Sequence, residues 1–242
     1  MMAVVPAAGR GSRLGELTAV VPKALVTVAG SALVDRVLHG LHAAGIEPIV
    51  IVTGHRGDQL EAHLAGRDGV VCVRQDRLDG TAGAVGVARG HVGDAPFLVT
   101  WVDVLAEPRH YHQVTSLLDA GADAVIGVQA VDDPYEGAAV YLDGDRVSRV
   151  VEKPARGTST TIWNNAGISA FRSVVWPYVD RVSVSERGER EMTSVVSEMI
   201  DAGLDVRAAV LEGSIVEVGS AERLAEVERW MPPLRPTSGP RP

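Results

Sequence analysis

The sequence predicts an α/β protein with a three-layer, doubly wound, Rossmann-like architecture and a mixed, mostly parallel sheet. Short β-branched runs alternate with helical patterns up to residue 128, which is the arrangement expected of successive βαβ units. The run at residues 49–52 is apolar at every position. Such a run is typical of a parallel strand that is covered on both faces.

The first half of the chain alternates regularly between the two kinds of element. Strands are expected at residues 4–5, 49–52, 70–73, 97–100 and 124–128. Helices are expected at residues 33–44, 58–64, 81–92 and 111–120. The first of these helices is amphipathic, because its apolar residues recur at helical spacing and share one face. Those residues are Leu33, Val34, Val37, Leu38 and Leu41.

The second half changes character, because a hairpin interrupts the alternation. Asp143-Gly144 is a turn signal between strands expected at residues 139–142 and 147–151. Further strands are expected at residues 168–171 and 206–211, and helices at residues 191–202 and 221–230. Without a visible repeat or linker, residues 1–231 are predicted to form one domain. The five prolines within residues 232–242 predict a disordered or loosely docked tail.

The composition argues against some classes of binding partner. The formal net charge of −8 argues against a nucleic-acid-binding protein, which would normally present a basic face. The chain begins without a basic signal-peptide region, and no apolar run approaches the ~20 residues of a membrane span. We therefore expect a cytoplasmic protein with no nucleic-acid or membrane partner. A phosphate ligand would require a local basic cluster.

The cysteine and histidine residues do not form a recognisable metal pattern. The lone Cys72 excludes an internal disulfide and is expected to be buried, which suits a reducing compartment. His110 and His112 are close together, but no further ligands lie near them in the sequence. We expect the seven histidines to be exposed.

A glycine-rich loop follows the first strand at residues 7–15. Its glycines permit positive φ angles and close approach of the main chain, so that successive amide groups can surround phosphate oxygens. Arg10, Arg13 and the later Lys23 add positive charge. The spacing differs from the dinucleotide fingerprint and from the P-loop, which disfavours a dehydrogenase. Taken alone, the glycines would equally suit a surface turn with solvated arginines.

The combined pattern of residues 7–14, 22–26 and 29–30 resembles the signature of the sugar-phosphate nucleotidylyltransferases. The resemblance extends over about residues 2–230 and implies a nucleotidyltransferase fold. It implies that Ala8, Gly9 and Gly11 belong to the nucleotide site. It also implies catalytic roles for Arg13 and Lys23, which would stabilise charge on the triphosphate.

Residues 75–84 are similar to the second nucleotide motif of that family, Gln…Leu-Gly-Thr-Ala-Gly. The similarity assigns Gln75, Gly80 and Thr81 to the nucleotide site, with the Gln amide and the glycine next to the base. A solvated loop with Thr81 as helix cap is compatible with that role. Asp79 departs from the motif and leaves the base open, although Gln75 favours a pyrimidine.

Two carboxylates match the magnesium ligands of the family. Asp103 follows the strand at residues 97–100, where open α/β sheets bind ligands, in a segment similar to Asn-Gly-Asp-Val. Trp101 and Val102 depart from that segment and suggest a reshaped pocket. Glu217 stands where the family has its second metal-binding Asp. The resemblance therefore implies Mg²⁺ on Asp103 and Glu217, although Glu217 is one methylene longer.

Two further segments resemble the acceptor site. Residues 151–154 are similar to the Glu-Lys-Pro element, which implies that Glu152 bonds sugar hydroxyls and that Lys153 meets the sugar phosphate. Asn165 lies in a segment similar to Asn-Ala-Gly-Ile-Tyr and is implied to touch the sugar, while Ser169 stands in for the Tyr. Each segment alone would suit an ordinary surface pair or turn.

The resemblance implies a magnesium-dependent nucleotidylyltransferase. It would transfer NMP from an NTP to a sugar 1-phosphate, release pyrophosphate and form an NDP-sugar. One alternative is a cytidylyltransferase that acts on a phosphorylated amino alcohol or phosphonate. Another is a non-catalytic relative that binds nucleotide or sugar. The expected partners are an NTP and a phosphorylated small molecule, and a homo-oligomer is left open.

Overall fold

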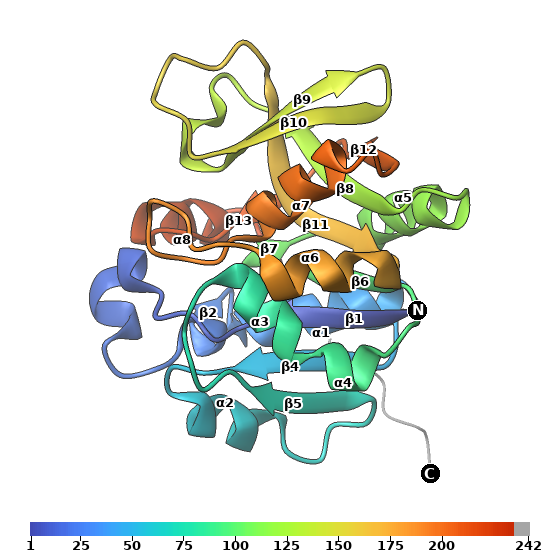
Figure 1. Ribbon diagram of the computed structural model, residues 1–242. Coiled ribbons are helices and arrows are strands. Elements are labelled where there is room, and N and C mark those ends of the chain that lie inside the picture. Colours follow the sequence, from blue (N-terminus) through green and yellow to red (C-terminus); the bar gives the residue numbers. More distant parts are fainter. Residues whose placement is uncertain (235–242) are drawn as a thin grey trace.

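A nine-stranded mixed β-sheet runs through the molecule, with β5 at one end and the hairpin of β9 and β10 at the other (Figure 1). The computed structural model describes residues 1–234. The strand order is β5-β4-β1-β6-β11-β8-β12-β10-β9. The strands are β1 (Met2–Pro6), β4 (Ile49–Thr53), β5 (Val70–Arg74), β6 (Phe97–Thr100), β8 (Ala124–Ala130), β9 (Ala138–Asp143), β10 (Arg146–Glu152), β11 (Trp163–Phe171) and β12 (Val206–Val210).

The pairings define the strand directions. β1 pairs in parallel with β4 and β6, β4 with β5, and β8 with β12. β11 is antiparallel to β6 and β8, and β10 is antiparallel to β12 and β9. β10 and β11 therefore run against the other seven strands. Two small ribbons accompany the sheet, β2 (Thr27–Val28) with β3 (Ser31–Ala32) and β7 (Val104–Leu105) with β13 (Val216–Glu217).

Helices cover both faces of the sheet, and the apolar core is divided accordingly. Helices α1 (Leu33–Ala43), α2 (Gly57–Leu64), α5 (Pro108–Asp119) and α8 (Ala221–Glu228) contribute to one core cluster. Helices α3 (Thr81–Val87), α4 (Arg89–Val92), α6 (Trp176–Arg181) and α7 (Met192–Asp201) contribute to the other. Along β1, Ala3 and Val5 belong to the first cluster and Val4 to the second, as the alternation of a strand requires. The predicted α/β class is confirmed.

Three elements differ from expectation. The predicted helix at residues 81–92 is two helices, α3 and α4, within a glycine-rich segment of poor helix formers. β11 begins at Trp163, five residues before the predicted strand, because Asn164, Asn165 and a bulge interrupt its apolar pattern. Helix α6 was not expected. The predicted hairpin is confirmed, with β9 and β10 joined through Gly144 at φ 63°.

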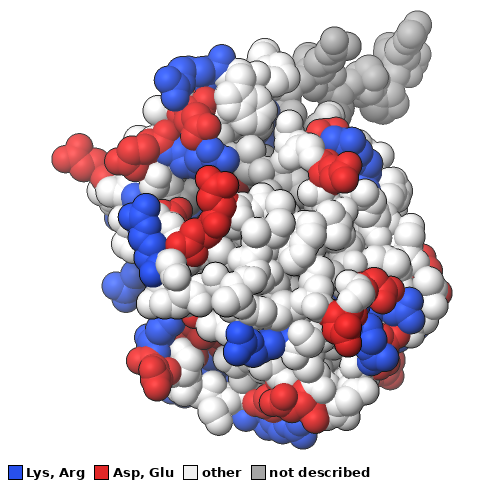
Figure 2. Space-filling model, turned by 90° about the horizontal axis from the view of Figure 1, so that it is seen from above, with Lys and Arg blue, Asp and Glu red and all other residues white. Residues whose placement is uncertain are grey.

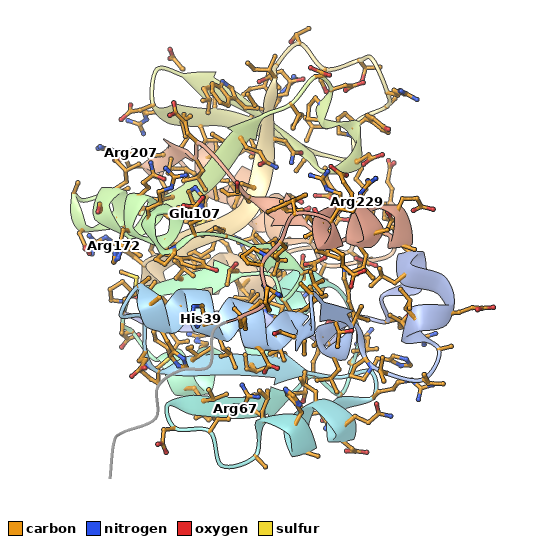
Figure 3. All side chains as sticks on the ribbon, turned by 180° about the vertical axis from the view of Figure 1, so that it is seen from behind. His39, Arg67, Glu107, Arg172, Arg207 and Arg229 are labelled. Carbon is orange, nitrogen blue, oxygen red and sulfur yellow. The ribbon has the colours of Figure 1, made fainter. Side chains whose placement is uncertain are left out.

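Two predictions about burial were wrong, namely that Cys72 is buried and that His110 is exposed. Cys72 is only half-buried, because β5 is an edge strand of the sheet. His110 is completely buried near the start of α5, which follows Glu107 (labelled in Figure 3). Its Nδ1 accepts from the Glu107 N–H at 3.1 Å, and its Nε2 lies 2.9 Å from the Glu212 carbonyl oxygen. A neutral imidazole protonated on Nε2 satisfies both contacts, so His110 has a structural role.

The end of α5 is tied to the sheet by Arg172 (labelled in Figure 3). Its guanidinium donates to the carbonyl oxygens of Leu118 and Ala122 at 2.7 and 2.9 Å. A cation at this position satisfies carbonyl groups that a helix end leaves without partners.

The C-terminal end of the described chain lies near α1. Arg36 on α1 donates to the Pro232 carbonyl oxygen at 3.0 Å, so the described chain returns to α1. The remainder of the predicted tail, residues 235–242, lies outside the described residues. Within residues 1–234, no helix has the length and apolarity needed to cross a membrane.

Replacing Trp176 by alanine is expected to cost about 3–5 kcal/mol of unfolding free energy. The Trp176 ring stacks on Phe97 with centroids 4.8 Å apart, and its Nε1 donates to the Gly93 carbonyl oxygen at 3.0 Å. Urea unfolding measures the change. Trp230→Ala is the matched control, because that side chain is 48% exposed and its loss should stay within about 0.5 kcal/mol. Equal losses for the two variants would contradict this description of the core.

Candidate functional site

A cavity of about 710 Å³ brings all thirteen predicted site residues together. They lie at or near the ends of strands that are distant in the sequence, at the edge of the sheet where α/β folds bind ligands. The sequence segments involved are the loop after β1, the turn before α3, the end of β6, the ends of β10 and β11, and the ribbon strand β13. The residues are Ala8, Gly9, Gly11, Arg13, Lys23, Gln75, Gly80, Thr81, Asp103, Glu152, Lys153, Asn165 and Glu217.

Several basic residues line this cavity, although the chain as a whole has a negative net charge. The sequence contains only two lysines, Lys23 and Lys153, and both line the cavity. Arg10, Arg13 and Arg187 line it as well. Six carboxylates line the same cavity, namely Asp103, Glu136, Glu152, Glu189, Glu191 and Glu217. Figure 2 shows acidic and basic side chains in mixed groups on one face of the molecule. The cavity therefore offers a phosphate ligand individual cationic contacts between carboxylates, and not a uniformly positive surface.

The glycine-rich loop is folded back onto Lys23. Gly11 has φ 66°, and a Cβ placed there would lie 2.9 Å from the Cβ of Lys23. The Thr18 hydroxyl donates to the Gly11 and Gly15 carbonyl oxygens at 3.1 and 3.2 Å, which closes the loop over the short 3-10 helix at Ser12–Thr18. A glycine is needed at position 11 because the chain turns through the left-handed region against a neighbouring side chain.

Two cation–carboxylate pairs lie at the centre of the site. Lys23 Nζ bonds Asp103 Oδ2, and these side chains are only 14% and 12% exposed. Arg13 lies 3.4 Å from Glu217 Oε1. Each predicted catalytic cation thus contacts one predicted metal ligand.

The ribbon of β7 and β13 brings the two carboxylates near each other. Glu217 pairs with Val104, the residue after Asp103, and the Val218 N–H donates to the Asp103 carbonyl oxygen at 2.8 Å. The Glu217 side chain is 49% exposed, yet partial desolvation at the cavity wall raises its pKa and the charge of Asp103 raises it further, while Lys23 and Arg13 act in the opposite direction. The two carboxylates therefore repel each other, and a cation between them would relieve that repulsion.

These carboxylates fit Mg²⁺ by their chemistry. Magnesium prefers hard oxygen ligands and is commonly held by one or two carboxylates, with water and substrate phosphates completing the shell. No group of three or more His, Cys, Asp or Glu side chains with metal-site geometry occurs among residues 1–234. A site of this kind would suit an ion that arrives together with a phosphate ligand, rather than a permanently bound structural metal.

Glu152, at the end of β10, Lys153, which follows it, and Asn165 on β11 line the same cavity. Burial raises the pKa of Glu152, and the neighbouring Glu191 carboxylate raises it further. Lys153 has φ 40°, and its N–H donates to the Gly137 carbonyl oxygen at 2.8 Å, which holds the strained residue in place. Asn165 Oδ1 accepts from the Gly167 N–H at 2.9 Å, so its amide NH₂ group stays available.

Trp101 packs against Gly167 in the same region. A Cβ at Gly167 would lie 2.9 Å from Trp101 Cδ1 and 2.6 Å from Val104 Cγ2. Trp101 and Ser169 both line the cavity. The aromatic ring in this part of the wall therefore comes from the end of β6, whereas the family pattern would place a Tyr on β11.

Arg187, Glu191 and Thr193 also line the cavity, although the sequence assigned them no role in binding. Arg187 lies 3.1 Å from Glu191 and 3.9 Å from Glu152. Arg187, Glu191 and Thr193 lie at and just before the start of α7, where the sequence predicts only a helix at residues 191–202. The density of charged residues at 186–191 is the signal that could have indicated a role in the site.

The residues that the resemblance assigns to the base lie at the end of β5 and in the turn before α3. Gly80 has φ 116°, and a Cβ there would lie 2.4 Å from the Arg190 carbonyl oxygen. The Thr81 hydroxyl accepts from the Met192 N–H at 2.9 Å, so it bonds α7 rather than capping α3 as the sequence suggested. These contacts attach the turn firmly to the start of α7.

Comparison with known families yields a match to the family described as nucleotidyl transferase, over residues 2–231. The chain belongs to this family. It is 31% identical over 236 residues to a glucose-1-phosphate thymidylyltransferase of Streptomyces griseus, covering 95% of this chain and 65% of that protein. It is 28% identical over 221 residues to the bifunctional protein GlmU of Methanococcus aeolicus, covering 90% of this chain and 51% of that protein.

Solved structures support the fold of this nucleotidyl transferase family member. A UDP-glucose pyrophosphorylase complexed with UDP-glucose superimposes with a TM-score of 0.84 at 20% identity, covering 94% of this chain and 97% of that one. A putative glucose-1-phosphate thymidylyltransferase from Bacillus anthracis gives the same TM-score at 23% identity, covering 95% and 94%. The mixed α/β fold thus matches nucleotidyltransferase structures. The chain spans between about half and two thirds of the length of the curated relatives named above.

Proposed function

We propose that this protein is a magnesium-dependent nucleotidylyltransferase that transfers NMP from an NTP to a sugar 1-phosphate. The products would be pyrophosphate and an NDP-sugar. The observation that carries the proposal is the one cavity in which Lys23 pairs with Asp103 and Arg13 pairs with Glu217, and which Lys153 also lines. The names of the relatives support it, and so does the match over residues 2–231, which we assign to one three-layer, doubly wound domain.

The glycine loop and its neighbours would bind the nucleotide. The main chain at Ala8, Gly9 and Gly11 offers amide groups to the triphosphate, while Gln75, Gly80 and Thr81 would surround the base. Arg13 and Lys23 would leave their carboxylate partners and neutralise charge on the phosphates. Their role is to stabilise charge that develops as pyrophosphate departs.

Asp103 and Glu217 would hold the magnesium ion. When bound, the ion would neutralise phosphate charge and help to orient the reacting groups. The two carboxylates keep their own positions through the β7–β13 ribbon and the Val218 hydrogen bond.

The acceptor would occupy the far end of the cavity. Glu152 and Asn165 would bond the sugar hydroxyls, and Lys153 would hold the phosphate of the acceptor. An oxygen of that phosphate attacks the α-phosphorus of the NTP, a new P–O bond forms, and the bond to pyrophosphate breaks. A phosphate monoester is already nucleophilic, so positioning and charge neutralisation provide the catalysis without a general base.

A substrate panel tests this proposal. Five NTPs are combined with hexose 1-phosphates, phosphocholine and an aminoalkylphosphonate, and pyrophosphate release is measured. The proposal predicts release with at least one sugar 1-phosphate. Release confined to CTP with phosphocholine or the phosphonate would contradict the assigned acceptor. Binding of nucleotide without any product would indicate a non-catalytic relative.

Glu217→Asp is expected to retain or raise activity, because the shorter carboxylate matches the usual residue of the family at this position and remains a hard oxygen ligand. The rate of pyrophosphate release at a series of Mg²⁺ concentrations measures the effect. Glu222→Asp on α8 is the matched control, because that side chain is exposed. Complete loss of turnover by a folded Glu217→Asp protein would contradict metal binding at this position.

A further inference from the structure

The amide of Gln75 is held in one orientation at the nucleotide end of the cavity. We propose that Asp79 fixes this orientation and thereby selects nucleotides whose base carries a ring N–H on its pairing edge, namely uracil, thymine or guanine. The inference rests on the proposed function, in which this end of the cavity receives the base of an NTP.

The hydrogen bonds of Gln75 determine which of its atoms faces the ligand. Gln75 is 4% exposed, and its main-chain N–H donates to the Thr53 carbonyl oxygen at 2.8 Å. Its Nε2 donates to Asp79 Oδ1 at 3.0 Å and to the Gly80 carbonyl oxygen at 3.3 Å. Both partners are acceptors only, so chemistry places the NH₂ group toward them. Oε1 has no hydrogen-bond partner among residues 1–234, and Gln75 lines the cavity.

Asp79 is itself held on several sides. Its Oδ2 lies 3.5 Å from the Arg190 guanidinium, and its carbonyl oxygen accepts from the Arg190 N–H at 2.7 Å. Arg190 also donates to the carbonyl oxygens of Val179 and Val182. A Cβ at Gly83 would lie 1.9 Å from Asp79 Oδ1, so the carboxylate occupies space that only a glycine leaves open. The Asp79 carboxylate therefore has one position in which to receive the Gln75 amide.

This arrangement presents an acceptor, and not a donor, to the base. The ring N–H of uracil, thymine or guanine donates to such an oxygen. Cytosine and adenine present a ring nitrogen with a lone pair at the same place, so two acceptors would face each other unless the base shifts to bring its neighbouring amino group to Oε1. Rotation of the Gln75 amide would turn Oε1 toward Asp79 and Gly80, which leaves three acceptors without a donor. Unsatisfied buried polar groups of this kind lower affinity about 5- to 150-fold.

Calorimetric titration of the whole chain with UTP, dTTP, GTP, CTP and ATP in the presence of Mg²⁺ tests the inference without turnover. The tightest of UTP, dTTP and GTP is expected to bind at least about fivefold more tightly than CTP and ATP. Equal or tighter binding of CTP or ATP would overturn the inference and leave the proposed function standing. Failure to bind any of the five would overturn both.

Two variants test the role of Asp79 directly. Asp79→Ala removes the acceptor that holds the Gln75 NH₂ group, so it should reduce the discrimination against CTP and ATP several-fold, whereas Asp79→Asn keeps an acceptor oxygen there and should reduce it less. Asp76→Asn is the matched control, because Asp76 is exposed in the same segment and should keep the wild-type ratio. An unchanged ratio in Asp79→Ala, with thermal unfolding near that of the wild type, would overturn the assignment. If Asp79→Ala fails to fold, Asp79→Leu, which also lacks an acceptor, is measured in its place and judged in the same way.

Discussion

Asp103→Asn is expected to lower kcat at least about 10³-fold while the protein remains folded. Asp103 is nearly buried and contacts Lys23. Partial desolvation of Glu217 raises the pKa of Glu217, and the negative charge of Asp103 raises it further. Asparagine keeps an oxygen that Lys23 can bond, but it removes the negative charge that would attract a divalent ion. Activity should therefore fall much more than stability.

The rate of pyrophosphate release at saturating Mg²⁺ and substrate measures this effect, with circular dichroism as the check on folding. Asp94→Asn is the matched control, because the Asp94 side chain is exposed. Turnover of folded Asp103→Asn within about tenfold of the wild type would remove Asp103 from the catalytic machinery.

Lys23→Met should reduce kcat by about 10²–10³-fold, because one preorganised positive charge beside the phosphates is lost. The same variant should bind Mn²⁺ more tightly than the wild type when no nucleotide is present. Lys23 pairs with Asp103, so removal of Lys23 leaves two mutually repelling carboxylates that a divalent ion would stabilise.

Steady-state kinetics measures the change in kcat. A Mn²⁺ titration monitored by electron paramagnetic resonance measures the change in metal affinity. Arg223→Met provides the matched control, since Arg223 forms an exposed pair with Glu226 on α8. If metal affinity in Lys23→Met were unchanged or weaker, the interpretation of the Lys23–Asp103 pair as a competitor of metal binding would be wrong.

Much of the candidate site could be predicted because its residues lie in short contiguous motifs at strand ends. The loop at residues 7–15 follows β1 directly, and Asp103 follows β6, so the topology of an α/β sheet brings them to one edge. The approach of Glu217 to Asp103 has a different origin. It depends on β7 and β13, two strands of two residues each, which are too short to produce a periodic signal.

Where a prediction from the sequence was wrong, the local surroundings of the residues outweighed their apolar or polar pattern. β11 carries Asn165 and Gly167 where it lines the cavity, and Asn164 packs against Gly137, so its apolar alternation begins late. His110 is polar in type but buried, because two hydrogen bonds satisfy its ring nitrogens. The orientation of Gln75 depends on Arg190, which is remote in sequence. Contacts of this kind are not encoded in periodicity or composition.

Transfer of label shows whether this cavity joins an NTP to a sugar 1-phosphate. NTPs labelled at the α-phosphate are incubated with the protein, Mg²⁺ and each sugar 1-phosphate, and the products are separated. We expect the label to appear in an NDP-sugar, with unlabelled pyrophosphate formed in equal amount. A protein that binds nucleotide yet yields no labelled conjugate with any sugar 1-phosphate would contradict this expectation.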